Sequence, residues 1–177
     1  LADSTHLLAN DHPQNLFSGT VEKDDDSRML IIKTRHLELS LNPFKGLSIE
    51  SLKLNSQHSK KLIGSIPAHY FDNIELGADF YSGSLLVDIP HERRRLTDYC
   101  FVNPDIKFAK KSVEISADFS FGNSRMRKSF IINDSDEQII MQYRFLNWGK
   151  EKMIARVGNF IFLEEGFEGP MFYKTTS

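Results

Sequence analysis

The chain has 177 residues, a length typical of one domain, and its 22 basic and 24 acidic side chains give a formal net charge of −2. Hydrophobic residues make up 40% and charged residues 26% of the chain, a composition typical of a folded globular protein and not of a disordered one. The charge lacks the basic footprint that nucleic-acid binding needs, and no apolar run approaches the ~20 residues of a membrane span. We therefore expect neither nucleic acid nor membrane as a partner.

The first 15 residues are polar and contain loop formers, so we interpret residues 1–15 as a linker or flexible arm and residues 16–177 as one domain. The N-terminus has no basic start, no long apolar core and no initiator Met, so we expect no signal peptide and predict a piece of a longer protein. Cys100 is the one cysteine, which excludes an intrachain disulfide and fits a reducing, cytoplasmic location.

Short apolar runs separated by turn signals predict strands in the first half of the chain, at residues 17–22, 28–34, 36–41 and 47–54. Three adjacent aspartates at 24–26 lack the ligand spacing of a calcium-binding loop and predict a solvated turn. In the last of these strands the alternation slips between Ile49 and Leu52, which indicates a bulge or a change of face.

The second half shows the clearest alternation of apolar and polar residues, at 113–121, 125–132 and 139–145, followed by a long apolar strand at 153–163. Gly122-Asn123 is a candidate two-residue hairpin turn, and Lys128 breaks the parity of its strand. No amphipathic helix of ten or more residues is evident. The sequence predicts an all-β antiparallel sandwich, and leaves open whether part of a sheet is missing.

The stretch from Pro67 to Pro90 gathers aromatic and acidic residues between glycines, as a sugar-facing loop requires. Trp148, at a predicted turn, fits either a sugar platform or a plug in the core. The alternative for the stretch is an ordinary loop anchored by its apolar residues, with solvated acids. The candidate carbohydrate-binding residues are His69, Tyr70, Asp72, Glu75, Asp79, Tyr81 and Trp148.

Catalysis by a pair of carboxylates requires oxygens about 5 Å apart in retaining glycosidases and about 6.5–9.5 Å apart in inverting ones. Asp72, Glu75 and Asp79 could meet such distances, but so could many acidic trios, and no ligand spacing typical of a metal site is present. We therefore assign no catalytic residue, no metal and no cofactor.

Three segments carry a resemblance to a known family: LELSLNPFKGLSIESL, RVGNFIFLEEGF followed by MFYKT, and IELGADFYSG. The first resembles the opening hairpin of galactose-mutarotase-like supersandwich domains. The others are similar to segments of the β-rich domains that follow the catalytic barrel in family 57 glycoside hydrolases and related glucanotransferases. The resemblance covers residues 28–175 and implies a supersandwich whose parent protein carries its catalytic acids in a separate barrel, so none of those acids is assigned to this chain.

Three hypotheses for function follow from these features. The first is a non-catalytic β-sandwich that binds an oligosaccharide or glucan, or braces a catalytic domain of the same protein. The second is an aldose-epimerase-like enzyme acting through His and Glu residues, for which His69, His91, Glu164 and Glu165 are left unassigned to the epimerase positions. The third is a structural or interaction sandwich. The resemblance and the aromatic–acidic stretch favour the first.

Overall fold

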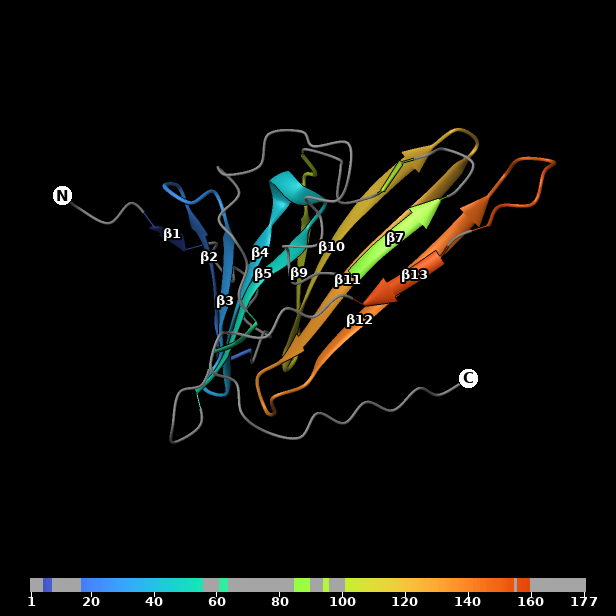
Figure 1. The fold of residues 1–177 in the computed structure, drawn as a ribbon. Coiled ribbons are helices and arrows are strands. Elements are labelled where there is room, and N and C mark those ends of the chain that lie inside the picture. The colour runs from blue at the N-terminus through green and yellow to red at the C-terminus, as the bar shows by residue number, and fades with distance from the viewer. Residues whose placement is uncertain are drawn as a thin grey trace.

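The protein is all-β and antiparallel (Figure 1). The computed structural model describes residues 5–7, 17–55, 61–63, 85–89, 94–95, 101–154 and 156–159, with side chains described for 17–55 and 101–154. In this part of the chain one short 3-10 helix, η1 (Pro43–Lys45), is the only helical segment, and no helix is long and apolar enough to cross a membrane.

A six-stranded sheet is formed by the N-terminal third of the chain, and its strands follow one another in sequence order. Its outermost strand β1 lies within the segment interpreted from the sequence as a linker. The strands are β1 (Thr5–Leu7), β2 (Thr20–Asp24), β3 (Leu30–Lys33), β4 (Leu37–Asn42), β5 (Ser48–Leu54) and β6 (Lys61–Ile63).

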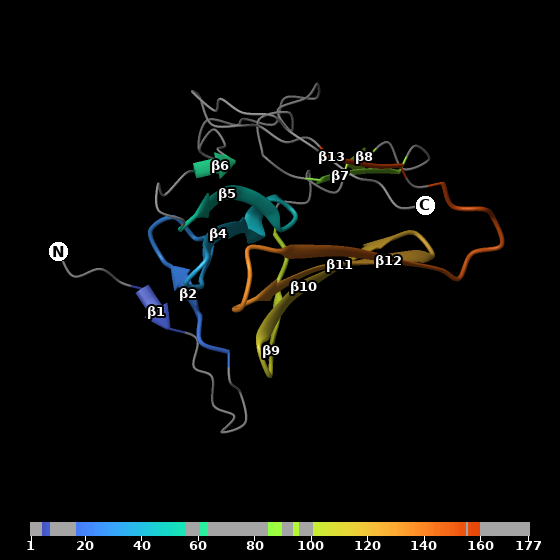
Figure 2. The ribbon, with the colours of Figure 1, turned by 90° about the horizontal axis from the view of Figure 1, so that it is seen from below.

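The remaining described strands form two further sheets. A four-stranded meander contains β9 (Asp105–Ala109), β10 (Ser112–Phe121), β11 (Ser124–Asn133) and β12 (Ile139–Asn147). A three-stranded sheet has the order β13-β7-β8, formed by β13 (Arg156–Asn159), β7 (Leu85–Ile89) and β8 (Arg94–Arg95). Figure 2 shows the small sheet lying over the four-stranded sheet as a separate layer.

The core lies between the six-stranded and the four-stranded sheets, because the apolar residues of both form one buried cluster. Strand alternation explains this packing, since every second side chain of a strand points to the same face. The buried positions predicted from alternation in β10 and β11 are confirmed. The cluster includes Val21, Leu30, Ile32, Leu37, Leu39, Leu41 and Ile49 from one sheet, and Val113, Ile115, Ala117, Phe119, Phe121, Met126, Phe130 and Ile132 from the other.

The bulge and the hairpin turn predicted from the sequence are both present. The register between β4 and β5 shifts at Ser40/Leu41, so the bulge predicted between Ile49 and Leu52 is confirmed, with Glu50 as the extra residue. The Gly122-Asn123 turn joins β10 to β11, and Gly122 has a φ of 52°, a conformation that glycine adopts without steric cost.

Two strand boundaries predicted from the sequence are wrong. The strand predicted at 17–22 is β2, which begins at Thr20 and not at Phe17, because Ser18 turns away to donate from its backbone N–H and its hydroxyl to Asp134 Oδ2, at 2.8 and 3.0 Å. Met153 and Ile154 are not in a strand, because the chain is still in the loop that follows β12. Of the strand predicted at 153–163, the described residues 156–159 form β13.

The contact between Ser18 and Asp134 joins the segment before β2 to the turn after β11. We expect Asp134→Ala to lower the free energy of unfolding by about 1–3 kcal/mol, because Asp134 is buried and its loss leaves the Ser18 donors without this partner. Urea denaturation measures the change. Asp136→Ala is the matched control, because within the described part of the chain this exposed aspartate of the same turn accepts only from the backbone N–H of Gln138, at 3.0 Å. Equal losses for both variants would contradict the prediction.

Candidate binding site at the end of the four-stranded sheet

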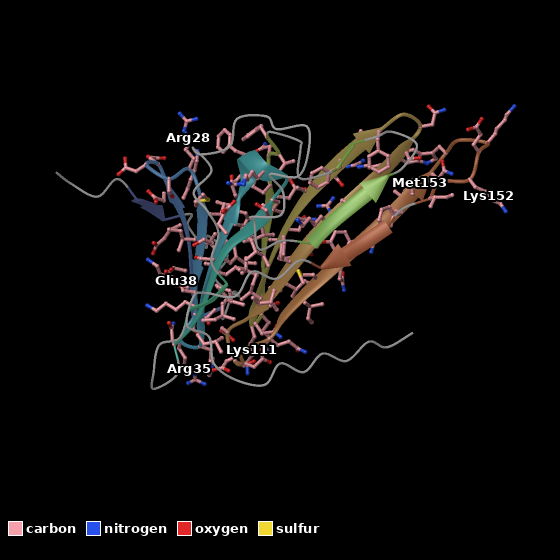
Figure 3. All side chains as sticks on the ribbon, viewed as in Figure 1. Arg28, Arg35, Glu38, Lys111, Lys152 and Met153 are labelled. Atoms are coloured by element: carbon pink, nitrogen blue, oxygen red, sulfur yellow. The ribbon has the colours of Figure 1, made fainter. Side chains whose placement is uncertain are left out.

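A pocket of about 540 Å³ lies at the edge of the four-stranded sheet where β10 and β12 end and β11 begins. The pairing brings these ends into one place, because Phe121 pairs with Ser124 across the hairpin and Ser124 pairs with Asn147 of β12. Figure 3 labels Lys152 and Met153 at this end of the molecule, in the loop beyond β12. The lining residues are Phe121, Asn123, Ser124, Asn147, Trp148, Gly149, Lys150, Glu151, Lys152 and Met153.

Asn147 holds the walls of this pocket together. Its Oδ1 accepts hydrogen bonds from Ser124 Oγ at 3.1 Å and from the backbone N–H of Gly149 at 2.9 Å, and its Nδ2 donates to the Glu151 carbonyl at 2.8 Å. The side chain thereby links the β10–β11 hairpin to the loop that follows β12. Asparagine suits this position because its short amide both accepts and donates within a turn.

Gly149 keeps the turn close to Asn147. A Cβ at position 149 would lie 3.1 Å from Asn147 Oδ1, a contact tighter than most side chains allow. The Trp148 backbone N–H donates to the Asn123 carbonyl at 3.0 Å, which fixes the backbone of the tryptophan against the hairpin. The indole ring therefore lies on a turn that hydrogen bonds hold both to the β10–β11 hairpin and to the Asn147 side chain.

The Trp148 side chain is 67% exposed, so it is not a plug in the core. Phe121 and Met153 supply apolar surface, while Asn123, Ser124 and Glu151 supply amide, hydroxyl and carboxylate groups. The volume lies in the range of about 300–1,000 Å³ that is typical of small-molecule sites. A flat, exposed ring beside donors and acceptors can cover the C–H face of a polar ligand while its hydroxyls form hydrogen bonds.

The other six candidate residues predicted from the sequence, His69, Tyr70, Asp72, Glu75, Asp79 and Tyr81, lie outside the described residues. Of the predicted set, the structure therefore places only Trp148, and it places it in a pocket. The predicted candidates do not include Asn123, Ser124 or Asn147, although Gly122-Asn123 and the position of Trp148 are both predicted turns. Only the pairing of β10, β11 and β12 brings these turns together.

Outside this pocket, charged groups of the four-stranded sheet form a network. On the face of the four-stranded sheet opposite the core, Arg127 donates to Asp118 Oδ2 at 3.3 Å, to Asp105 Oδ2 at 2.7 Å and to Ser116 Oγ at 2.7 Å, and Arg125 also pairs with Asp118. Among the described residues, no group of three or more His, Cys, Asp or Glu side chains is placed to hold a metal ion.

Comparison of the chain with family models, with curated proteins and with solved structures returned no match.

Proposed function

We propose that this β-sandwich is a non-catalytic carbohydrate-binding domain, and that Trp148 is the platform on which a sugar ring stacks. The observation that carries the proposal is the 67% exposure of the indole on a turn fixed by Asn147, inside a pocket with amide, hydroxyl and carboxylate groups. Exposed large aromatic side chains fixed by hydrogen bonds cost little entropy when they bind a ligand.

We further propose that the domain works beside a catalytic domain of the same protein. The resemblance of residues 28–175 to domains that accompany family 57 glycoside hydrolases suggests an accessory role beside a catalytic domain of the same protein. In that role the pocket would hold an oligosaccharide or glucan near a separate active site.

The tryptophan provides a direct test, because Trp148 is the only tryptophan of the chain. We expect a maltooligosaccharide or a cellooligosaccharide to shift the fluorescence emission of Trp148 to shorter wavelength as the ring leaves water. Calorimetry should show that Trp148→Ala weakens the same binding about tenfold or more, the loss typical of a central aromatic anchor. The melting temperature should stay nearly unchanged because the side chain is exposed.

Phe101→Ala is the matched control, because Phe101 is also exposed, at 59%, but lies away from this pocket. Oligosaccharide affinity should be the same in this variant as in the parent. If neither class of oligosaccharide binds at millimolar concentration, or if both variants weaken binding equally, the proposed function is wrong.

A further inference from the structure

A second pocket, of about 330 Å³, lies at the rim of the core between the six-stranded and four-stranded sheets. It is formed by three segments: the β2–β3 hairpin, the η1 turn, and residues 101–106 at the start of β9. Figure 3 labels Arg28 at this rim and Arg35 at the opposite end of the six-stranded sheet. The lining residues are Lys23, Arg28, Leu30, Pro43, Phe44, Phe101, Asn103, Pro104 and Ile106.

Most of the lining is apolar. Leu30 is buried and belongs to the core, and Ile106 packs against the core from the facing sheet, so the pocket adjoins the core. The rings of Phe44 and Phe101 stand 5.2 Å apart in a tilted pair, yet they remain 37% and 59% exposed. A hydrogen bond of 2.8 Å from the Val102 N–H to the Pro43 carbonyl holds the two segments together.

Two cations complete the rim. The Arg28 guanidinium lies over the Phe44 ring, 5.4 Å from its centroid, and Lys23 stands on the neighbouring strand. Among the described residues, neither cation forms an ion pair. The nearby Asp24 is held within its own turn by the backbone N–H of Asp26 and the Ser27 hydroxyl, and it does not line the pocket.

Arg28 also has a φ of 58°, a left-handed conformation that a residue with a Cβ rarely adopts. Such backbone strain persists only where the surrounding structure requires it, and it concentrates at ligand sites and tight turns. Here the strained residue is the one whose guanidinium lies over the Phe44 ring.

We propose that this rim pocket binds an organic carboxylate with a compact apolar or aromatic body. The body would occupy the apolar space between Phe44 and Phe101, and the carboxylate would face Arg28 and Lys23, where a guanidinium offers a planar pair of donors. Among the described residues that line the pocket there is no carboxylate to accept from hydroxyl groups, which distinguishes it from the Trp148 pocket with its Glu151. The ligand class is thus different from a sugar, and this proposal is independent of the proposed function.

The test compares 3-phenylpropanoate with its neutral analogue 3-phenylpropanol by titration calorimetry and by amide chemical shifts. We expect the carboxylate to bind at least about tenfold more tightly than the alcohol, the difference that one charge-assisted hydrogen bond supplies. Arg28→Gln should weaken the carboxylate about tenfold while leaving the alcohol unchanged. Phe101→Ser should weaken both compounds.

Arg35→Gln is the matched control, because it removes the same charge from an exposed arginine at the other end of the sheet. It should bind both compounds as the parent does. The proposal is overturned if the carboxylate does not bind at millimolar concentration, if the alcohol binds as tightly, or if Arg28→Gln and Arg35→Gln behave alike. Shifts confined to the Trp148 loop would also overturn it, and circular dichroism verifies that each variant is folded.

Discussion

Replacing Lys128 with methionine is expected to raise the free energy of unfolding at pH 6 by about 1–4 kcal/mol, the range seen when buried charges are replaced by apolar residues. Lys128 stands on the core face of β11, opposite Ala117 on β10 and Tyr143 on β12. Its side chain is 3% exposed, and its Nζ donates to the Gly46 carbonyl at 3.3 Å and lies 5.2 Å from the centroid of the Phe130 ring.

Burial lowers the pKa of Lys128 from 10.5 to about 7 because the ammonium form loses its hydration in the core. The difference corresponds to roughly 5 kcal/mol at 1.36 kcal/mol per unit of pKa. Methionine has a similar length and no charge, so it should remove this cost. Some of the gain is offset because the Gly46 carbonyl loses its bond to Lys128, a loss of about 1 kcal/mol.

The pH dependence of stability follows from the same shift. In the unfolded chain Lys128 holds its proton up to its usual pKa, whereas in the folded protein it releases the proton above about pH 7. Between these two pH values the unfolded state binds more protons, so the free energy of unfolding should rise with pH. The difference between parent and Lys128→Met should be largest below pH 7 and should shrink toward pH 10.

Tyr143 limits this rise at high pH. Burial raises the pKa of its phenol, and its hydroxyl has no hydrogen-bond partner among the described residues. Above the usual pKa of tyrosine, Tyr143 ionises in the unfolded chain before it ionises in the folded protein, so the free energy of unfolding should fall there. We therefore expect the parent to be most stable near the upper end of the pH range that lies between the folded and unfolded pKa values of Lys128.

Urea denaturation at several pH values between 6 and 10 tests both effects. Lys107→Met is the matched control, because Lys107 is exposed on β9, and its pH profile should parallel that of the parent. A Lys128→Met variant that is less stable than the parent at pH 6, or whose pH profile is parallel to the parent's, would falsify the prediction.

Phe119→Ala is expected to lower the free energy of unfolding by about 3–5 kcal/mol, the loss typical of truncating a fully buried phenylalanine. The Phe119 side chain is 2% exposed in the core between the sheets, beside Met126 on the neighbouring strand, which is fully buried. Removing the ring deletes apolar surface from the core and leaves a cavity that rigid strands on both sides cannot close.

The control for this prediction is Ser120→Ala, one residue along the same strand. Ser120 is exposed on the opposite face of β10, so its change should stay within about 0.5 kcal/mol. Equilibrium unfolding in urea measures both variants. A loss below about 1 kcal/mol for Phe119→Ala would mean that the space left by the ring is filled by its neighbours.

Much of the fold could be predicted from local pattern. The alternation at 113–121 and 125–132 predicts which side chains of β10 and β11 face the core, because a strand places every second residue on one face. The slip in alternation near Ile49 and the Gly122-Asn123 pair predict a bulge and a hairpin turn for equally local reasons. The ends of the strands could not be predicted as well from local pattern. The start of β2, for example, depends on the hydrogen bond from Ser18 to Asp134, which is 116 residues away in sequence.

The candidate site could be predicted only in part. Trp148 stands out in the sequence as the single tryptophan, but its position at a turn fits a core plug as well as a platform. Its exposure depends on the loop that Asn147 folds against the β10–β11 hairpin, and the pocket depends on three strand ends meeting. The contact between Ser124 and Asn147 joins residues 23 positions apart, so no local pattern contains it.

The sequence by itself determined the buried faces of β10 and β11 and the hairpin turn between them, because these follow from side-chain alternation and backbone preferences over a few residues. The tertiary structure alone decided which ends of strands meet. It placed Lys128 against the Gly46 carbonyl, 82 residues away, and it gathered Arg28, Phe44 and Phe101 from three segments into one rim. The physical reason is that burial and pocket shape are properties of two sheets packed together, and the packing is set by the whole apolar surface and not by any one strand.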